Sequence, residues 1–463
     1  MRLWLLFLGS ASSLAAAEYV FSDSADSVGA HSQSYPLTTC NGLTIGSTTS
    51  SIEVPSSLVT VCIYRASLDE TVHDSPPSIV TWQRSISHGL DTALRQQTRI
   101  AQTVFSKRLP LETQLEVLHQ AGDRHTIVLS LPSWLLPRID ELLPSDAKVT
   151  LVSSTPLEAV PKHAIERLEQ LTASLRFSPK YDAALSSMSE VDIAADLAVL
   201  TGQRPDAPWI TRHSYTSGAR QAAHWLRKQI EQDERANCTF EHFRAAFAPN
   251  VICRFTGRKS GSKVVILSAH LDSRGTFGEV RAPGADDDGS GTGGILAVAR
   301  AIRNYVESFE HDVMLCLFAG EEQGLVGSRA FAPQVRAAGL DVIIMLQSDM
   351  IAYRKPGEPL QLGFPADGTA TAAATDLVSN ISSMYAPQLR VGPTRACCSD
   401  HQSFFEQGLA STQLFERAGD IALPVYHDSH DLTTQKGYDF YQLKSIAQVM
   451  LATVLVTGNA TIV

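Results

Sequence analysis

The feature that most constrains this chain is a buried-strand pattern that leads directly into a cluster of acidic residues. Val264 to Leu267 is a short β-branched and leucine-rich run, which is typical of a buried parallel strand. His270 and Asp272 follow it, and a Gly/Pro-rich loop then brings three consecutive aspartates, Asp286 to Asp288. Ligands of open α/β sheets bind at the carboxyl ends of the strands. A histidine and carboxylates at that edge indicate a hard or borderline metal cation.

Taken alone, this stretch also fits a solvated acidic loop after an ordinary strand, but two further strands end in the same way. Val313–Phe318 precedes Glu321 and Glu322, and Val342–Leu346 precedes Asp349. Three strands with acidic or histidine endings make chance a weak explanation. The remaining elements alternate in type, which predicts an α/β fold. They are a strand at Ser411–Phe415 and helices at Gly218–Gln232 and Tyr441–Val456.

The length of 463 residues is too great for one core of average size and predicts two domains. Residues 18–160 lack a chemical signature, and their patterns predict a small N-terminal α/β domain. Residues 161–190 are amphipathic and are expected to form a helical linker, and residues 191–463 hold the acidic motifs. The elements expected in the small domain are strands at Leu58–Ile63, Thr126–Leu131 and Lys148–Ser153, with a short helix at Ser133–Leu143.

Residues 1–17 are typical of a secretory signal peptide. Met1-Arg2 supplies the basic start, Leu3 to Gly9 the apolar segment, and Ala15-Ala16-Ala17 the small residues of a cleavage site. We therefore expect an extracellular protein whose mature chain starts at Glu18. In a secreted eukaryotic chain, N-x-Ser/Thr sequences mark surface glycosylation sites. Three such sequences begin at Asn237, Asn380 and Asn459.

The formal net charge of −10 argues against nucleic acid or an anionic membrane as a partner, and a monomer is expected. No apolar run approaches the length of a membrane span. Seven cysteines in an exported protein predict disulfides and leave one thiol unpaired. Cys316 lies in an apolar run and is expected to be buried, whereas the pairing of the adjacent Cys397 and Cys398 stays open. Local bridges are plausible for Cys40 with Cys62 and for Cys238 with Cys253.

Five separated motifs occur in order over roughly residues 190–463. They are His270-Leu-Asp272-Ser, the acidic loop Gly284 to Gly291, the segment Ala319 to Ser328, Asp349, and Tyr426-His-Asp-Ser-His-Asp431. Together they resemble the secreted di-zinc leucyl aminopeptidases of bacteria and fungi, with glutamate carboxypeptidases and glutaminyl cyclases as more distant relatives. The resemblance implies a phosphorylase/hydrolase-like α/β sandwich around a mixed, largely parallel sheet. It also implies peptide substrates and two zinc ions per subunit.

The resemblance further implies a ligand set of five residues. Asp287 would bridge the two zinc ions, with His270 and Asp349 completing one site and Glu322 and His427 the other. Carboxylate oxygens and imidazole nitrogens are suitable zinc ligands.

Two residues beside these ligands need separate interpretation. Asp272 stands two positions after His270, where it is expected to hold the second ring nitrogen of that ligand. His430 competes with His427 as a ligand, and the family pattern Tyr-His-x-x-x-Asp favours His427.

Glu321 is the expected general base, because its neighbour Glu322 is committed to a metal while Glu321 stays free for proton transfer. Met350 and Phe415 resemble positions that line the pocket for the substrate's first side chain, which predicts a preference for Leu, Met or Phe. Both residues also fit an ordinary apolar core, Phe415 especially, since it lies within a predicted strand.

The chain departs from the family at Ala396, where relatives carry a tyrosine that helps to stabilise the oxyanion, and Arg395 stands beside it. We expect the zinc ions or Arg395 to take over that role. The alternative functions are a glutaminyl-cyclase-like acyltransferase and a non-catalytic relative. A complete set of five ligands and a base favours the hydrolase. The N-terminal domain is expected to be an intramolecular chaperone or inhibitor that is removed before about residue 190, with a permanent packing domain as the alternative.

Overall fold

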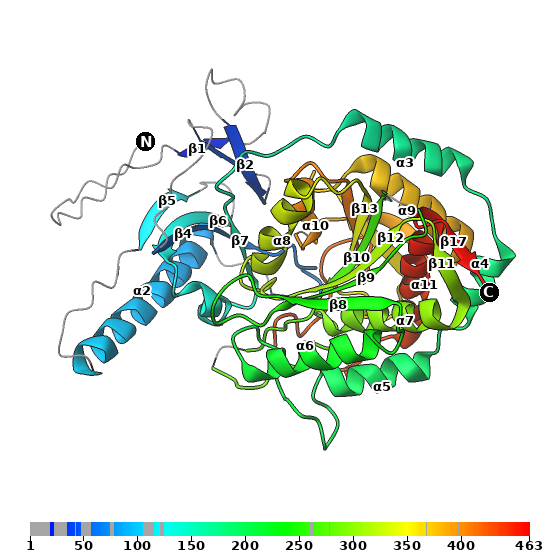
Figure 1. The fold of residues 1–463 in the computed structure, drawn as a ribbon. Coiled ribbons are helices and arrows are strands. Elements are labelled where there is room, and N and C mark those ends of the chain that lie inside the picture. Colours follow the sequence, from blue (N-terminus) through cyan, green and yellow to red (C-terminus); the bar gives the residue numbers. More distant parts are fainter. Residues whose placement is uncertain are drawn as a thin grey trace.

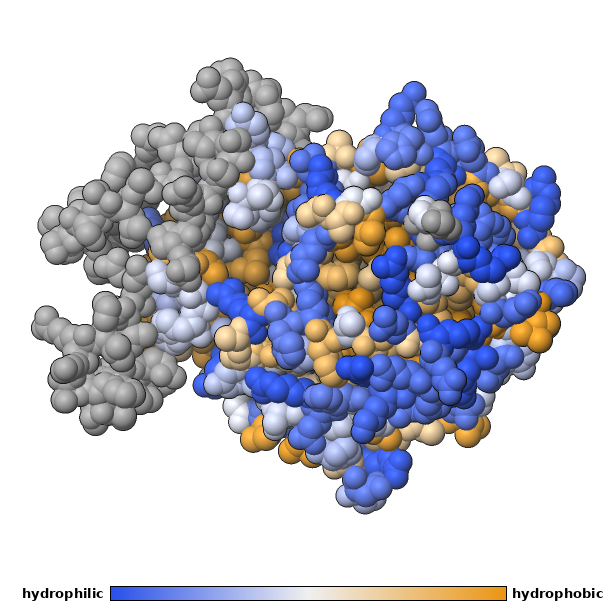
Figure 2. All heavy atoms as spheres, in the orientation of Figure 1, coloured by the Kyte–Doolittle hydropathy of each residue, from blue (hydrophilic) through white to orange (hydrophobic). Residues whose placement is uncertain are grey.

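The computed structural model describes residues 19–22, 35–41, 43–47, 57–74, 78–104, 115–120, 125–259, 261, 263–276, 278–366, 368–396 and 398–463. The predicted signal peptide lies outside these residues. Figure 1 shows two bodies, a small one drawn in blue and cyan and a large one drawn in green to red. On the face drawn in Figure 2, hydrophilic side chains cover most of the lower surface of the large body.

The large domain is built on a six-stranded sheet in the order β16-β13-β10-β12-β9-β8. The first four strands are parallel, and the last two are antiparallel to their neighbours. Every residue of β10, β12 and β13 is buried, and most of these residues are apolar, as is typical of central parallel strands. The expected mixed, largely parallel sheet is confirmed. Its strands are β8 (Ala236–Glu241), β9 (Asn250–Phe255), β10 (Val264–His270), β12 (Asp312–Phe318), β13 (Val342–Ser348) and β16 (Ser411–Leu414).

Helices cover both faces of this sheet, because alternate residues of each strand point to opposite sides. Val265 and Leu267 of β10 face the larger helical layer, whereas Ile266 faces the smaller one. The larger layer contains α5 (Glu190–Leu200), α6 (Ser217–Ile230), α7 (Gly289–Tyr305), α9 (Ala372–Tyr385) and α11 (Phe440–Thr457), and the smaller layer contains α8 (Val326–Ala337) and α10 (His401–Phe405). Within the described residues, α11 alone is long and apolar enough to cross a membrane, but 72% of its apolar window is buried inside the fold.

Two small two-stranded sheets and two helices complete the large domain. β11 (Val306–Phe309) pairs with β17 (Ala460–Ile462), and β14 (Gln361–Pro365) pairs with β15 (Arg390–Thr394). The segment expected to be a linker forms α3 (Lys162–Ser174) and α4 (Pro179–Ser186). Leu168 and Leu185 of these helices lie in the main core. We therefore assign both helices to the large domain instead of a linker.

The small domain is a four-stranded antiparallel sheet, β5-β6-β4-β7, with one long helix on one face. Trp82, Ile86 and Leu90 of that helix are spaced four residues apart and pack on the sheet. The other face carries the three-stranded sheet β1-β3-β2, tied to β4 by the disulfide Cys40–Cys62. The elements are β1 (Tyr19–Ser22), β2 (Tyr35–Cys40), β3 (Leu43–Ser47), β4 (Leu58–Arg65), α2 (Ile79–Val104), β5 (Glu116–Gln120), β6 (Thr126–Pro132) and β7 (Ala147–Leu151).

The α-helix predicted at 133–143 is wrong. This stretch forms two 3₁₀ turns, η1 (Leu136–Arg138) and η2 (Asp140–Leu142). Pro137 cannot donate a backbone hydrogen bond, and Pro144 follows the second turn, so a continuous helix is not available. These turns carry the chain toward the large domain.

The plausible local disulfides are both present. Cys40 is bonded to Cys62, and Cys238 is bonded to Cys253. Cys316 is a free, buried thiol in β12. Cys398 is also disulfide-bonded, whereas Cys397 lies outside the described residues.

A buried ion pair joins the two domains beside η2. His213 of the large domain lies with its Nε2 2.9 Å from Asp140 Oδ2 of the small domain, and Glu141 Oε1 lies 3.9 Å away. The His213 ring also contacts the Gln323 amide and the backbone N–H of Tyr215. Burial disfavours the charged imidazole, but the Asp140 carboxylate outweighs that cost, so the pKa of His213 is raised.

This pair predicts a pH-dependent stability. The folded-state pKa of His213 lies above its unfolded value, so the contribution is complete below about pH 6.5 and is lost as the pH rises through the folded-state pKa. We expect His213→Gln to lower the free energy of unfolding by about 1.5–3 kcal/mol at pH 6 and by progressively less toward pH 10. Thermal unfolding across this range measures the effect. His163→Gln, at an exposed position on α3, is the control. A deficit that stays constant from pH 6 to pH 10 would contradict the assignment.

Candidate metal centre

The carboxyl ends of three neighbouring strands bring the predicted site residues together. β10 ends at His270, which is in register with Phe318 at the end of β12, and Glu321 and Glu322 follow three and four residues later. Asp349 directly follows β13, the other neighbour of β10. Because these strands are parallel, their side chains converge on one edge of the sheet.

Two groups of three side chains meet there, and Asp287 belongs to both. Its Oδ1 lies 3.2 Å from His270 Nε2, which is in turn 3.5 Å from Asp349 Oδ1. Its Oδ2 lies 3.3 Å from His427 Nε2, which is 3.3 Å from Glu322 Oε2. The two oxygens of one carboxylate thus face two separate donor sets, which is the arrangement of a bridging ligand.

The donor sets fit zinc. Among the described residues, His270 Nε2, Glu322 Oε1 and Asp349 Oδ1 are buried without a hydrogen-bond partner. Buried polar atoms are nearly always satisfied, so these atoms indicate a missing ligand. Two ligands of a tetrahedral zinc with bonds of about 2.0–2.1 Å lie roughly 3.3 Å apart, which matches the separations between the side chains. The donors present in each group therefore fit a zinc ion.

Two aspartates, Asp431 and Asp288, hold the acidic loop in position. Asp431 accepts hydrogen bonds from the backbone N–H groups of Asp286 and Asp287, at 3.0–3.1 Å. Asp288 caps α7 through the N–H of Gly291 at 2.9 Å and also accepts from the N–H of His270 at 3.0 Å. A Cβ at position 291 would lie 2.4 Å from the Asp288 carboxylate, so glycine is required there. The Asp-Asp-Asp-Gly-Ser-Gly sequence therefore fixes both the helix start and the bridging carboxylate.

Asp272 links a ligand to the base. Its Oδ1 lies 3.6 Å from Nδ1 of His270, opposite the Nε2 that faces Asp287. The same carboxylate accepts hydrogen bonds from the backbone N–H groups of Glu321 and Glu322, at 3.3 and 3.4 Å. Asp272 thus orients the His270 ring and holds the Glu321-Glu322 turn beside it.

The electrostatics of the site favour a cation. Burial raises the pKa of Glu322 well above its usual range, and the neighbouring Asp287 and Glu321 carboxylates add to that rise. Asp287 behaves in the opposite way: burial opposes its charge, but hydrogen bonds from His270 and His427 lower its pKa. Burial and the nearby Arg274 guanidinium lower the pKa of His427 to about 4, so its imidazole is neutral and able to bind a metal.

Glu321 points into the same buried space. Burial raises its pKa to about 8, against the opposing effects of Lys148 and His270. Its Oε1 has no hydrogen-bond partner among the described residues and lies 3.9 Å from Nζ of Lys148. Sequence reasoning missed Lys148, which comes from β7 of the small domain. Burial disfavours its charge, but Tyr426 and Glu321 raise its pKa well above the usual value.

The two candidate histidines lie in different surroundings. His427 is buried beside Asp287 and Glu322, whereas the His430 side chain is 80% exposed and bonds to Asp428 at 2.6 Å. Nδ1 of His427 lies 2.8 Å from the Ser145 carbonyl and 2.8 Å from Nη1 of Arg274. Sequence reasoning also missed Arg274, although it follows Asp272 by only two residues.

This difference gives a matched pair of variants. We expect His427→Ala to lower the zinc content from two ions per chain to one or fewer, because it removes one of three donors from its group. His430→Ala should keep both ions, since its ring faces solvent. Metal analysis after dialysis against buffer of low free zinc measures both. Equal zinc loss in the two variants, or loss in His430→Ala alone, would reverse the ligand assignment.

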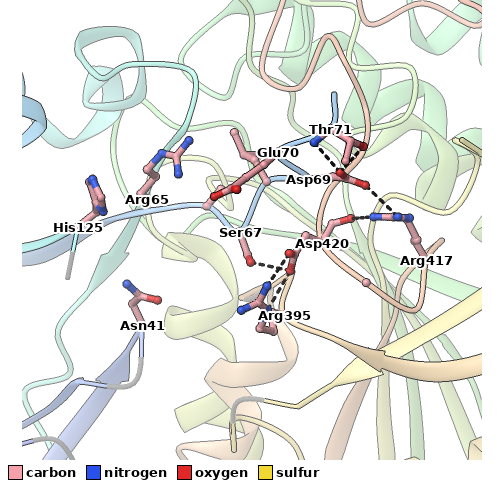
Figure 3. Close-up of a pocket in the computed structure, with 13 residues that line it drawn as sticks. Asn41, Arg65, Ser67, Asp69, Glu70, Thr71, His125, Arg395, Arg417 and Asp420 are labelled. Carbon is pink, nitrogen blue, oxygen red and sulfur yellow. Dashed lines mark hydrogen bonds and ion pairs between the residues drawn. The ribbon is translucent and has the colours of Figure 1, made fainter. Parts of the chain in front are cut away.

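Met350 and Phe415 are buried in one apolar cluster, which also contains Ala396. This position fits both the predicted substrate pocket and an ordinary apolar core. The role expected for Arg395 is not supported. Its side chain is 75% exposed and pairs with Asp420 across the rim of a cavity (Figure 3). The salt bridge to Asp420 occupies the Arg395 guanidinium. The cation that pairs with Glu321 is instead Lys148, at 3.9 Å.

Comparisons with known proteins agree with this arrangement. Residues 250–454 match the family model described as Peptidase family M28. Leucine aminopeptidase 1 of Arthroderma otae is 26% identical over 364 residues, covering 73% of this chain and 92% of that protein. Leucine aminopeptidase 1 of Sclerotinia sclerotiorum is 29% identical over 248 residues, covering 50% of this chain and only 63% of that protein. The LapA aminopeptidase of Legionella pneumophila shares the fold, with a TM-score of 0.60 and 17% identity over 87% of this chain and 99% of that chain.

Proposed function

We propose that this chain is a metallo-aminopeptidase of the Peptidase family M28 type, and that it removes hydrophobic N-terminal residues from peptides with two zinc ions and Glu321 as the general base. The observation that carries the proposal is the position of Asp287, whose two carboxylate oxygens face two separate donor sets. The family match supports zinc dependence, and the two donor sets support the count of two ions.

In the proposed centre each side chain has one task. His270, Asp349 and Asp287 would hold one zinc ion, and Glu322, His427 and Asp287 the other. Bound zinc supplies Lewis acidity, which lowers the pKa of water and polarises a carbonyl oxygen. The chain supplies the shape of the site: Asp272 fixes the His270 ring, and Asp431 fixes the backbone of Asp287.

Glu321 moves the proton. Its carboxylate takes a proton from the attacking water and returns it to the amine that leaves when the peptide bond breaks. Its backbone N–H is bonded to Asp272, so the base is held by the same residue that orients a zinc ligand.

The apolar cluster of Met350, Phe415, Ile421 and Tyr426 supports a hydrophobic pocket for the substrate's first side chain. Hydrolysis rates on a panel of aminoacyl anilides and dipeptides, measured with and without a chelator, test this specificity. We expect Leu, Met and Phe substrates to be cleaved fastest and chelation to abolish cleavage. A strict preference for acidic or basic first residues would refute the pocket, and conversion of N-terminal glutamine to pyroglutamate without hydrolysis would favour the cyclase alternative.

We also propose that the protein is secreted and glycosylated. Disulfides form and persist in oxidising compartments, and this chain carries Cys40–Cys62 and Cys238–Cys253. The three sequon asparagines, Asn237, Asn380 and Asn459, are all exposed, so each is accessible to modification. Mass spectrometry of the exported protein, with and without deglycosylation, tests both points.

A further inference from the structure

Lys148 enters the metal centre from the small domain. It lies on β7, the edge strand of the small sheet, and its side chain is 13% exposed. Its Nζ donates a hydrogen bond to the backbone carbonyl of Cys398 at 3.0 Å and lies 3.9 Å from Oε1 of Glu321. The ammonium group is thus held between a carbonyl and a carboxylate of the large domain, beside the proposed base.

The neighbouring turn of the small domain covers the centre around this lysine. The Ser145 carbonyl lies 2.8 Å from Nδ1 of His427. The buried Arg274 guanidinium donates to the carbonyls of Leu143, Pro144 and Ala147, at 2.8–3.0 Å. Consequently the side chains of Glu321, Glu322 and His427 are only 2–3% exposed. Among the described residues, the turn therefore leaves little of these three side chains accessible to a peptide.

A second segment of the small domain fills the apolar cluster beside the centre. Ala66 packs with Met350 and Phe415, the two residues predicted to line the substrate pocket, and Leu68 packs against the same cluster. The segment is extended and pairs with Ile421: the N–H of Ile421 donates to the Ser67 carbonyl, and the N–H of Asp69 donates to the Ile421 carbonyl, both at 2.8 Å. Backbone pairing of this kind, with side chains in adjacent pockets, is a common mode of peptide recognition.

The outer part of the interface between the small and the large domain is polar and partly open. Lys355 bonds to Asp69 at 2.7 Å, Arg417 bonds to the same carboxylate at 2.9 Å, and Ser67 bonds to Asp420 at 2.7 Å. Ser67, Asp69, Arg417 and Asp420 line a cavity of about 800 Å³ between the domains (Figure 3). Polar interfaces between domains resemble those of transient complexes, which can separate.

We propose that the Lys148 ammonium occupies the binding site for the N-terminal ammonium of the peptide substrate, so that the small domain acts as a built-in substrate mimic and keeps the peptidase latent. The inference rests on the proposed function, because a primary ammonium is the group that every aminopeptidase substrate presents. A lysine side chain presents the same group, with three donors and no acceptor. The Cys398 carbonyl accepts a hydrogen bond from this ammonium, and the Glu321 carboxylate, 3.9 Å away, supplies the opposite charge. Ala66 and Leu68 take the place of the substrate's first side chain.

The test compares variants of the full chain loaded with zinc. Lys148→Met keeps the length of the side chain and removes the ammonium, so we expect it to hydrolyse leucine anilide at least about tenfold faster than the intact wild type, because breaking a buried charge contact weakens such an interface by that much or more. Lys148→Arg keeps the cation and is expected to stay latent. Lys162→Ala, at a position that is 89% exposed, is the control and should match the wild type.

A second arm separates the domains. A recognition site for a sequence-specific endopeptidase, inserted between the exposed Ser154 and Thr155, allows one peptide bond to be hydrolysed. We expect cutting to activate the enzyme. Lys148 should react with an acylating reagent only after the cut, whereas Lys162 should react before and after it, as read by mass spectrometry. An intact wild type as active as the cut chain would overturn the proposal, as would slower hydrolysis by Lys148→Met, which would make the lysine a participant in turnover.

The labelling experiment also distinguishes failure of the substrate-mimic proposal from failure of the proposed function. If no form of the chain hydrolyses any aminoacyl substrate, the proposed function fails. Rapid acylation of Lys148 in the intact chain would contradict the mimic whether or not the enzyme is active. Protection of Lys148 together with activity that appears on cutting supports both.

Discussion

Changing Glu321 to glutamine is expected to lower turnover by about 10²- to 10⁴-fold while both zinc ions stay bound. The amide keeps the size of the side chain but cannot accept the proton of the attacking water. All five proposed ligands remain, and the backbone N–H of residue 321 still bonds to Asp272. Steady-state kinetics measure the loss of turnover, and metal analysis measures the zinc content. Wild type and variant are compared in the same form, either both intact or both cut.

Glu322→Gln is the matched comparison, because it makes the same chemical change one residue away. Oε2 of Glu322 lies 3.3 Å from His427 Nε2 in the second donor set, and an amide is a poorer zinc ligand than a carboxylate. This variant is therefore expected to lose zinc as well as activity. If both variants lose zinc, or if both stay active, the division of labour between the two glutamates is wrong.

Asp287→Asn is expected to have the second large effect, which is the loss of both ions through one substitution. The carboxylate offers one oxygen to each donor set, so the amide would leave each set with two good ligands in place of three. We expect the zinc content to fall from two ions per chain to less than one and activity to fall with it. Zinc analysis together with circular dichroism separates metal loss from unfolding.

Asp428→Asn is the control for that variant, because Asp428 lies in the same region but bonds to Thr276 and His430 and to neither donor set. It should retain two ions. Loss of a single ion in Asp287→Asn, with the other retained at full occupancy, would show that Asp287 belongs to one site and does not bridge.

The convergence of the candidate site residues could be predicted because these residues follow the ends of three strands. His270, Glu322 and Asp349 each follow an apolar run, and the parallel pairing of β10 with β12 and β13 brings those ends together. The glycines after Asp288 were equally informative, since a side chain at Gly291 would collide with the capping carboxylate. The sequence pattern and the geometry of the site both arise from short apolar strands that lead into tight loops.

The contribution of the small domain could not be predicted in this way. Lys148 and Ser145 carry no motif, and they reach Glu321 and His427 only because two separately folded bodies pack together. The same holds for Arg274, whose partners are backbone carbonyls of residues 143–147. Contacts between domains depend on surface shape, which periodicity and spacing do not encode.

Two errors within the small domain have local causes. The helix α2 was missed although Trp82, Ile86 and Leu90 recur at intervals of four residues, which is a helical signal. The helix expected at 133–143 fails because Pro137 interrupts the pattern of backbone donors. The spacing of the apolar residues indicates α2, and the position of Pro137 argues against a helix at 133–143.

The most direct test of the account is a crystal structure of the zinc-loaded chain with anomalous difference maps recorded at the zinc absorption edge. The account predicts two peaks, one contacted by His270, Asp349 and Asp287 and the other by Glu322, His427 and Asp287, with Asp287 common to both. A single peak, or two peaks of which one is contacted by His430 in place of His427, would contradict it.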